Sequence, residues 1–540
     1  MTPPEREQVA DVGLVLEGTY PYVLGGVSAW VDQIIRGLPE VTFSILYIGA
    51  KPDPDAKQFY ELPGNVICLK EIFLHQELDR KEQKPARMPL ELRAMMYQNL
   101  RRFHQAKTSE DRMDQFWTLL DGLREAGPKF RFGNLLRDRE CWDILRDVYD
   151  RFCPDESFID FFWTARFLHL PLWNLWQSRD SIPQARMYHS VSAGYAGLIG
   201  AIAARHRRVP YIVTEHGIYT KERIAEIGQA DWIYEPDRFQ INYSEGLGKL
   251  KQTWINLFIF LGEVAYQTAD QLLTLYEGNL HTQVEFGADV EKIDIVPNGI
   301  EPQNYNEFYK AQMDRWRTSP EKKYVGFIGR VVPIKDVKTL LRASRIVCDR
   351  VPGAEILIAG PYSEDPIYYD ECRKIVKMLQ IEDRVHFMGR QKLTDVLPKM
   401  DVIVLTSISE GLPLVMLEGM ACGKPIVASD VGACRELIFG RAPEDRLLGR
   451  AGRITKIMSP PETANAIVSI LENPATLRRM GVAGRQRAEQ FYSMTHMLDS
   501  YRDLYRQYSG NDGIEPRPNR PAVVNRSPTR RPKFNPVATR

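Results

Sequence analysis

The 540-residue chain has few cysteines and no excess of charge of either sign, and both shortages exclude classes of protein. Its seven cysteines are scattered over positions 68, 141, 153, 348, 372, 422 and 434, without a Cys-x-x-Cys pair. This pattern argues against a disulfide framework or a zinc site and indicates reduced thiols in a cytoplasmic protein. Lys and Arg number 71 against 70 Asp and Glu, so no overall positive field favours nucleic acid as a partner.

Long apolar runs are also missing. No stretch reaches the roughly 18–20 apolar residues that a membrane span requires, and the first residues lack the apolar core of a secretory signal. The aromatic-rich residues 158–176 are interrupted by Asp160, Arg166 and Pro171. Ordinary burial explains them better than a membrane-surface or partner-docking face. We therefore expect a cytoplasmic chain without a transmembrane segment, held at the inner membrane only through partners.

What the chain does contain is a repeated alternation of short apolar runs and helical patterns. This alternation is typical of doubly wound α/β sheets, and the length exceeds what one hydrophobic core accommodates. We predict an N-terminal Rossmann-like domain over residues 1–310 and a C-terminal one over residues 311–490. The polar residues 301–322 are interpreted as the linker between them.

Three further regions depart from the sheet pattern. Residues 75–181 are helical, charged and rich in aromatics, which indicates an insertion in the first domain; acceptor binding and partner docking both remain open for it. Residues 491–509 are predicted to form a helix that packs back on the N-terminal domain. Residues 510–540 are rich in Pro, Asn and Arg, a composition that cannot form a core, and are interpreted as a disordered basic tail that could contact anionic lipid or a partner.

One stretch, residues 409–418 (Ser-Glu-Gly-Leu-Pro-Leu-Val-Met-Leu-Glu), carries most of the predicted chemistry. The apolar residues 401–406 before it predict a buried parallel strand. Pro413 suits the first turn of a helix that begins at Leu414. Glu410 would then lie in the loop at the mouth of this helix and Glu418 inside it.

A helix N-terminus at the end of a strand can bind an anion, and the diphosphate of a nucleotide sugar is the obvious candidate. Carboxylates beside such a site need hydroxyl groups, which a sugar and a ribose supply. Taken alone, the spacing of the two glutamates is better explained by a structural joint with solvated side chains, since Glu is common on exposed helix faces.

Other candidates also follow predicted strands. Gly25 and Gly26 stand between the strand at residues 11–16 and a helix, where a ligand could approach the backbone closely. His216 comes at the carboxyl end of a strand, where open sheets bind ligands, although a structural role is as good an interpretation. His189 is more readily explained as structural.

Together these motifs resemble glycosyltransferase family 4, the retaining, nucleotide-sugar-dependent enzymes of the GT-B fold. The ordered set consists of Gly25-Gly26, the turn Val296-Pro-Asn-Gly299, Gly329-Arg330 followed by Lys335, and Glu410 with Glu418. The insertion and residues 214–219 (Thr-Glu-His-Gly-Ile-Tyr) are similar to the branch that assembles the Pel exopolysaccharide, the PelF glycosyltransferases. Two positions depart from the family pattern, because Asp336 stands where glycine is frequent and Glu301 where aspartate commonly follows the Asn-Gly turn.

The resemblance implies two Rossmann-like domains facing a cleft and a role for each candidate residue. Arg330 and Lys335 would clamp the donor diphosphate, as a charged fork and a point charge can. Glu418 would accept hydrogen bonds from the ribose, and Glu410 would hold the transferred sugar. The remaining roles are sugar contact by His216, closure over the phosphates by Gly25 and Gly26, base contact by Arg390, and a backbone cradle at Gly411, Leu412, Pro413 and Leu414.

The implied function is transfer of a hexose from a UDP-sugar to a growing extracellular polysaccharide, without metal or other cofactor. UDP-glucose is the first choice of donor and a UDP-N-acetylhexosamine the second. Components of an inner-membrane polysaccharide synthase are the expected partners. Two alternatives stay open: a catalytically inactive nucleotide-sugar-binding scaffold of such a synthase, and a UDP-sugar 2-epimerase, for which no additional carboxylates can be nominated.

Overall fold

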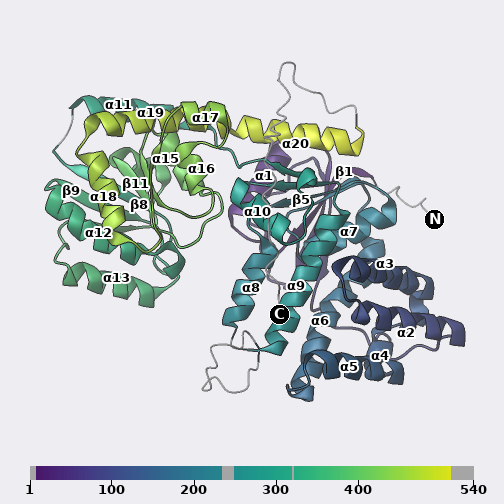
Figure 1. The fold of residues 1–540 in the computed structure, drawn as a ribbon. Coiled ribbons are helices and arrows are strands. Elements are labelled where there is room, and N and C mark those ends of the chain that lie inside the picture. The colour runs from purple at the N-terminus through teal and green to yellow at the C-terminus, as the bar shows by residue number, and fades with distance from the viewer. Residues whose placement is uncertain (1–7, 231, 234–247, 319–320, 512–540) are drawn as a thin grey trace.

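The computed structural model describes residues 8–230, 232–233, 248–318 and 321–511, which form two α/β halves (Figure 1). The strands of the N-terminal half are β1 (Ala10–Glu17), β2 (Phe43–Gly49), β3 (Val66–Phe73), β4 (Ala185–Ser190), β5 (Tyr211–Glu215), β6 (Gln271–Thr274) and β7 (Ile293–Ile295). Those of the C-terminal half are β8 (Lys323–Ile328), β9 (Ala354–Ala359), β10 (Val385–Gly389), β11 (Val402–Leu405), β12 (Ile426–Ser429) and β13 (Gly452–Thr455).

Each half is built on one parallel sheet. The first has the order β3-β2-β1-β4-β5-β6-β7 and the second the order β10-β9-β8-β11-β12-β13, and the paired strands run parallel throughout. In both sheets the order reverses beside the first strand, which is where a doubly wound sheet opens a crevice. The predicted α/β architecture is therefore confirmed.

Helices cover both faces of the first sheet. They are α1 (Gly26–Gly37), α7 (Tyr195–Arg207), α8 (Tyr219–Gln229), α9 (Lys249–Thr268), α10 (Glu277–Glu285) and α20 (Met494–Ser509). Apolar side chains of α7 and α9 form one core with the sheet, and those of α1 and α20 form another on the opposite face. Strands covered on both faces need continuous apolar runs, which is why β1 is buried along nearly its whole length.

The insertion between β3 and β4 is a helical layer at the outer side of this half (Figure 1). It consists of α2 (Leu90–Gln105), α3 (Ser109–Ala126), α4 (Phe132–Arg137), α5 (Arg139–Phe152) and α6 (Phe158–Ser178). Burial accounts for only one face of the aromatic α6: Phe161, Trp173 and Trp176 are buried, whereas Trp163 and Phe167 are about half exposed.

The second half has helices on both faces of its sheet as well. They are α11 (Asn306–Thr318), α12 (Val337–Arg350), α13 (Pro366–Met378), α14 (Leu393–Val396), α15 (Leu414–Ala421), α16 (Cys434–Phe439), α17 (Pro443–Leu447), α18 (Pro460–Leu471) and α19 (Pro474–Phe491). Short 3-10 turns are η1 (Gly127–Lys129), η2 (Arg179–Ser181), η3 (Val290–Lys292), η4 (Pro302–Tyr305), η5 (Pro333–Lys335) and η6 (Leu397–Lys399).

The predicted linker and the predicted domain boundary were wrong, and one strand of this half was not predicted. Residues 301–322, expected to be a linker, contain η4 and α11, and Trp316 of α11 is buried in the core of the second half. The domain boundary predicted at residue 310 therefore falls inside a helix. Strand β13 was not predicted, because its sequence Gly-Arg-Ile-Thr contains one apolar residue.

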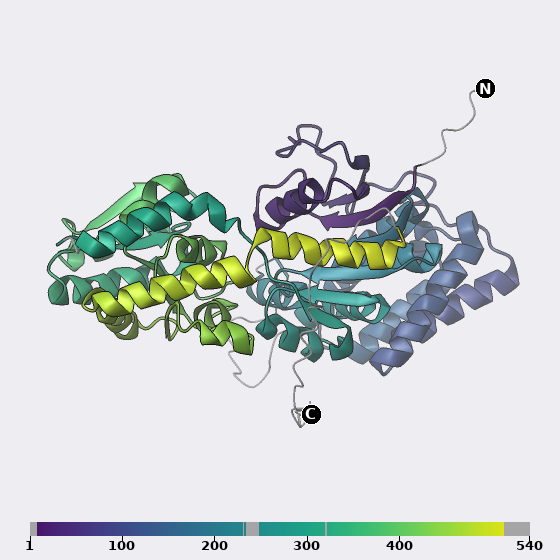
Figure 2. The same ribbon diagram turned by 90° about the horizontal axis from the view of Figure 1, so that it is seen from above.

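The chain passes between the halves at two points that lie side by side. Ile300 pairs with Ser493 as an isolated parallel bridge, and the Ile300 N–H donates to the Tyr492 carbonyl (2.9 Å). A Cβ on Gly299 would lie 2.4 Å from the Ser493 carbonyl oxygen, so this crossing needs glycine. After it, α20 runs on from α19 and packs on the first sheet (Figure 2).

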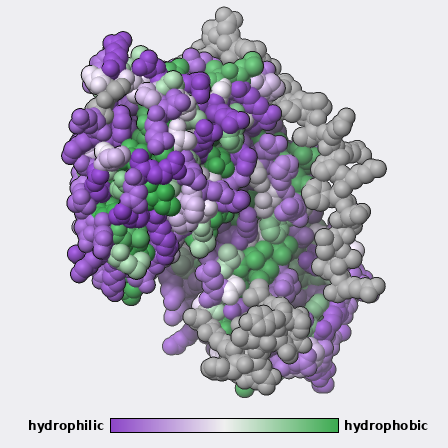
Figure 3. All heavy atoms as spheres, turned by 60° about the vertical axis from the view of Figure 1, so that its left-hand side comes forward, coloured by the Kyte–Doolittle hydropathy of each residue, from purple (hydrophilic) through white to green (hydrophobic). Residues whose placement is uncertain are grey.

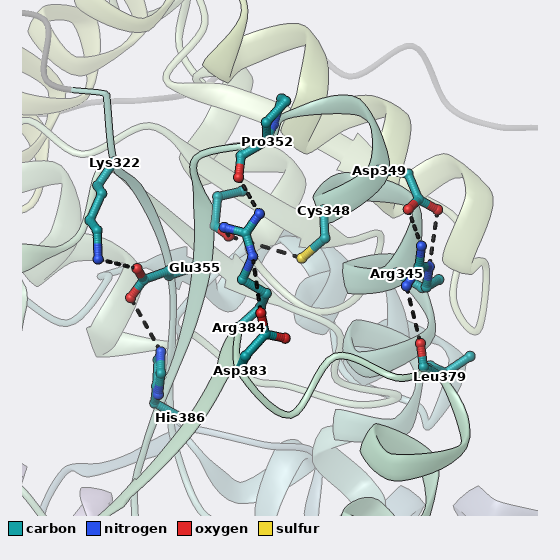
Figure 4. Close-up of polar contacts among 11 residues, drawn as sticks. Lys322, Arg345, Cys348, Asp349, Pro352, Glu355, Leu379, Asp383, Arg384 and His386 are labelled. Carbon is teal, nitrogen blue, oxygen red and sulfur yellow. Dashed lines mark hydrogen bonds and ion pairs between the residues drawn. The ribbon is translucent and has the colours of Figure 1, made fainter.

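At the amino edge of the second sheet the charged groups pair with one another. Glu355 at the start of β9 accepts a hydrogen bond from Lys322 (2.7 Å) and lies 3.2 Å from Nε2 of His386 on β10 (Figure 4). Arg345 pairs with Asp349 on the same helix. This edge is closed by its own side chains, in contrast to the carboxyl edge described below.

The seven cysteines are free thiols, five of them buried, as predicted. None of the helices that the structure describes combines the length and hydrophobicity that crossing a bilayer requires. The predicted basic tail, residues 510–540, lies outside the described residues except for its first two positions.

Candidate active site

The adjacency of β8 and β11 brings two of the predicted site loops together. These strands pair in parallel, so the loops after them leave the sheet side by side. The Ile408 N–H donates to the Ile334 carbonyl (2.9 Å), and Thr406 Oγ1 donates to the Lys335 carbonyl (3.2 Å). The backbone of one loop thus fixes the position of the other.

Lys335 and Glu410 form an ion pair between these loops. The Lys335 ammonium lies 2.5 Å from Glu410 Oε1, and Ser407 Oγ donates to the same oxygen at 2.5 Å. The two side chains are only 23% and 10% exposed. A charged pair this well covered must keep both partners satisfied, because an unpaired charge at such a site would be strongly unfavourable.

The backbone at Glu410 and Gly411 is held from two sides. A Cβ on Gly432, which has a φ of +52°, would lie 2.3 Å from the carbonyl oxygens of both residues. From the other side, a Cβ on Gly411 would lie 3.3 Å from the carbonyl oxygen of His216. The loop that carries Glu410 therefore meets the N-terminal half at the predicted residue His216.

The predicted helix after this loop is observed as α15, with Pro413 as its N-cap residue and Leu412 buried. Glu418 lies in its second turn and accepts a hydrogen bond from the Tyr305 hydroxyl of η4 (3.3 Å). Burial raises the pKa of the Glu418 carboxyl above its usual value. With Tyr305 as its one side-chain partner in the described part of the chain, this desolvated carboxylate retains capacity for further hydrogen bonds from a ligand.

Arg330 and Arg390 are less enclosed. The Arg330 guanidinium lies 3.0 Å from Glu364, on the loop after the neighbouring strand β9, and both side chains are about half exposed. The structure does not bring Arg330 into the Lys335–Glu410 pair. Arg390 is exposed at the end of the edge strand β10.

His216 follows β5 directly and has two buried ring nitrogens without a hydrogen-bond partner among the described residues. Its ring packs edge-on against Trp30 of α1, with centroids 4.7 Å apart. Burial lowers the pKa of His216 to about 4. The ring is therefore neutral near pH 7 and offers one N–H donor and one nitrogen acceptor.

His189, expected to be structural, contrasts with His216. Its ring nitrogens lie 2.8 Å from the Tyr505 hydroxyl and 2.8 Å from Thr214 Oγ1. Both partners are buried, and Tyr505 belongs to α20. His189 therefore fixes α20 on the sheet and has no capacity left for a ligand.

Gly25 and Gly26 cap and begin α1. The φ of Gly25 is 178°, an extended conformation open to any residue. Among the residues that the structure describes, a Cβ on either glycine would meet nothing within 4 Å beyond its chain neighbours and its own helix. Neither backbone conformation nor packing among the described residues explains the pair, and the space beside them could take a ligand.

A feature that the sequence analysis missed is a row of unsatisfied polar atoms along the first sheet. Besides His216, buried side-chain atoms without a partner among the described residues occur at or just after β1, β4, β6 and β7: Thr19 Oγ1, Ser192 Oγ, Thr274 Oγ1 and Asn298 Oδ1. All five positions lie at carboxyl ends of parallel strands. Buried polar atoms are normally hydrogen-bonded, so such a row marks a place for polar ligand groups. The sequence analysis had singled out His216 and the turn that contains Asn298, whereas for Thr19, Ser192 and Thr274 the only signal was a hydroxyl residue at a strand end.

The surface between the two halves is hollowed on the side shown in Figure 3, where an apolar area faces the C-terminal half. The unsatisfied polar atoms of the first sheet lie at the carboxyl ends of its strands, and so do the charged loops of the second sheet. The His216–Gly411 contact joins them. Such an arrangement can hold a charged, hydroxyl-rich ligand between neutral donors and paired charges.

Two family descriptions match the chain. "Domain of unknown function (DUF3492)" matches residues 10–291, and "Glycosyl transferases group 1" matches residues 322–473. Among curated relatives, the D-inositol 3-phosphate glycosyltransferase of Rhodococcus erythropolis is 26% identical over 331 residues, 59% of this chain and 68% of that protein. The alpha-maltose-1-phosphate synthase of Mycolicibacterium smegmatis is 24% identical over 335 residues, 58% of this chain and 77% of that protein.

Solved structures show the same fold. Alr3699/HepE of Anabaena, in complex with UDP, matches with a TM-score of 0.53 and 14% identity over 92% of this chain and 99% of that one. Sucrose-phosphate synthase of Thermosynechococcus elongatus matches with a TM-score of 0.53 and 16% identity over 92% and 98%. The two sheets facing a hollow are thus the GT-B fold, and the chain belongs to the DUF3492 family, with a C-terminal half of the glycosyltransferase group 1 type.

Proposed function

We propose that the chain is a retaining hexosyltransferase that uses a UDP-sugar donor and a polysaccharide acceptor. The observation that carries this proposal is the contact between the Glu410–Gly411 loop and His216. Through the His216 carbonyl it brings the loop of the Lys335–Glu410 pair next to the residue whose neutral imidazole has no hydrogen-bond partner among the described residues. A donor with a charged diphosphate and a neutral sugar needs both kinds of group.

The donor diphosphate would lie against the N-terminus of α15 and the Lys335 ammonium. Lys335 then exchanges part of its interaction with Glu410 for phosphate oxygens, and Glu410 becomes free to accept hydrogen bonds from sugar hydroxyls. Glu418 would accept from the ribose, which suits a carboxylate that accepts one side-chain hydrogen bond among the described residues, from Tyr305. Arg330 would reach the diphosphate only by leaving Glu364, an exposed pair that costs little to break.

The chemistry would rest on positioned charge. Lys335, the helix end and Arg330 would stabilise the leaving UDP as its negative charge develops, without a metal ion. The acceptor hydroxyl would attack from the face that UDP leaves, so that the anomeric configuration is retained. His216, neutral at physiological pH, would hold a hydroxyl of the transferred sugar through the nitrogens that lack a partner.

The choice of donor has support from the structural neighbours. HepE of Anabaena was solved with UDP, with UDP and glucose, and with UDP-glucose. UDP-glucose is therefore the first donor to test and UDP-N-acetylhexosamines the second. The Pel exopolysaccharide as product, and synthase components at the inner membrane as partners, rest on the resemblance of the insertion and of residues 214–219.

The test is calorimetry of the full chain with a panel of nucleotide sugars, followed by a transfer assay with each binder. We expect UDP and one UDP-hexose to bind and the anomeric configuration of the product to match the donor. Binding without turnover for every donor would favour the inactive scaffold. Failure of every nucleotide sugar to bind would contradict both.

A further inference from the structure

The helical insertion contains a cavity that the proposed transferase chemistry does not use. It has a volume of about 570 Å³ and is lined by α2, α3, α4, α5 and α6 of the insertion and by α7 and α9 beneath them. Protein interiors are packed with few voids larger than a water molecule. A hollow of this size falls in the ~300–1,000 Å³ range of small-molecule sites.

One end of the cavity is apolar. Phe130, Phe132 and Trp173 meet there, with the Trp173 ring 6.1 and 5.9 Å from the two phenylalanine rings. Cys141 and Ile144 of α5 complete this end, and both are buried. Apolar cavities stay dry and take up apolar molecules, because water gains no hydrogen bonds in them.

The polar lining residues gather at the other end. Helices α2 and α5 run parallel, since Arg93 pairs with Glu140 near their starts and Arg101 with Asp147 further along. The last turn of α2 carries His104, whose ring lies 5.7 Å from that of His169 on α6. The end of α2 therefore meets the middle of α6.

The first turns of α3 and α9 belong to the same end. Helix α3 follows α2 after a short turn and brings Arg112 to the lining, and α9 brings Lys249. The Lys249 N–H donates to Glu156 Oε1 (3.2 Å) on the connection between α5 and α6. Arg166, one turn from His169 on α6, completes the group.

The charges of the lining all have one sign. Three charged side chains, Arg112, Arg166 and Lys249, line the cavity, and no carboxylate does among the described residues. Neither arginine forms an ion pair within the described part of the chain; Arg166 lies instead over the Trp163 ring, 5.8 Å from its centroid. A cavity that is apolar at one end and basic at the other is complementary to an amphipathic anion.

We propose that this cavity binds a lipid with one apolar chain and an anionic head group. The chain lies between α2, α5 and α6 against Phe130 and Trp173. The phosphate or carboxylate of the head group contacts Arg112 and Arg166. The site is separate from the hollow between the two halves, and its occupation does not depend on the identity of the donor.

The experiment is a titration of the full-length chain with farnesyl phosphate, palmitate and uncharged farnesol. Calorimetry measures the affinity, and native mass spectrometry measures the number of molecules bound. We expect one molecule of an anionic probe per chain. Binding of farnesyl phosphate alone identifies a phosphate head group, and binding of palmitate alone a carboxylate. No saturable binding of either anionic probe would overturn the proposal.

Two variants test the two ends separately. The double variant Arg112→Glu, Arg166→Glu should weaken the anionic probes at least about tenfold through charge reversal at two partly buried positions, and leave farnesol unchanged. Ala165→Phe, which fills the cavity, should weaken all three probes. Arg146→Glu on the outer face of α5 is the matched control and should bind like the wild type. Equal binding by the double variant and this control would also overturn the proposal.

Discussion

Lys335, Glu410 and Glu418 at the carboxyl edge of the second sheet already have partners, whereas several neutral side chains at the carboxyl edge of the first sheet have none among the described residues. Lys335 has Glu410, and Glu418 has Tyr305. His216, Ser192 and Asn298 have buried atoms without a partner among the described residues. The difference follows from desolvation, because a bare charge costs far more to cover than a neutral hydroxyl or imidazole.

The two halves would therefore bind different parts of one ligand. The paired charges can be released only by a ligand that replaces them, such as a diphosphate. The unsatisfied neutral groups need no release and suit sugar hydroxyls, whose hydrogen bonds are uncharged.

Lys335→Met should have the largest effect. It leaves the Glu410 carboxylate covered and without its cation, and removes the proposed phosphate contact. We expect a loss in kcat/KM of about 100- to 1,000-fold with UDP-glucose, the range for removing one preorganised electrostatic contact. Lys338→Met is the matched control, because Lys338 also pairs with a glutamate, Glu371, but on the adjoining helix. Wild-type turnover in both variants would contradict the assignment of the Lys335–Glu410 pair to the diphosphate site.

Glu418→Gln should weaken UDP binding by about tenfold to 100-fold, as expected for a hydrogen bond to a charged group. The Tyr305 contact can survive in this variant, so that folding is preserved. Calorimetry with UDP measures the effect, and Glu472→Gln on an exposed helix end is the control. Unchanged UDP affinity would remove Glu418 from the nucleotide site.

His189 supplies a pH-dependent test of the satisfied histidine. Burial lowers the pKa of His189 to about 3, so the unfolded chain binds its proton more readily than the folded one. The neutral His189 ring therefore contributes to the free energy of unfolding at pH 7, and this contribution is lost as the pH falls below about 6.5 toward 3.

The variant His189→Gln can keep the contacts to Tyr505 and Thr214 but does not titrate. We expect the loss of stability between pH 7 and pH 5 to be smaller in the variant by about 2 kcal/mol. Urea unfolding at the two pH values measures it, and identical pH dependence in both chains would contradict the assignment of a buried neutral ring.

His216→Phe should have the smallest effect. The substitution keeps the ring against Trp30 but removes both nitrogens. We expect turnover to fall about tenfold, the value of one or two neutral hydrogen bonds, with UDP affinity unchanged. Because the pKa of His216 is about 4, turnover in the wild type should not titrate through this residue between pH 6 and 8. A change in UDP affinity would show that the two edges do not divide the ligand.

Much of the fold could be predicted because buried parallel strands are short apolar runs. The strand before Ser407 and the helix after Pro413 follow from local sequence alone. Helix α11 could not be predicted in this way, since its buried residues are only Gln312 and Trp316 in an otherwise polar segment. Its helical state depends on packing against the second half.

The site was predicted as a set of residues but not as a geometry. The Lys335–Glu410 pair requires β8 and β11 to be neighbours, although two strands separate them in the chain. The turn of Arg330 toward Glu364 and the unsatisfied atoms of Thr19 and Ser192 are likewise tertiary facts. The catalytic roles of Lys335, Glu410 and Arg330 stay predictions.

The bridge between Ile300 and Ser493 has a mechanical consequence for the whole molecule. Both passages between the halves touch at this point, so they form a single narrow pivot. Swinging the halves apart would bend the backbone here and leave both sheets intact. Since α20 is anchored to the first sheet through Tyr505, the last helix would travel with the N-terminal half while α19 travels with the other.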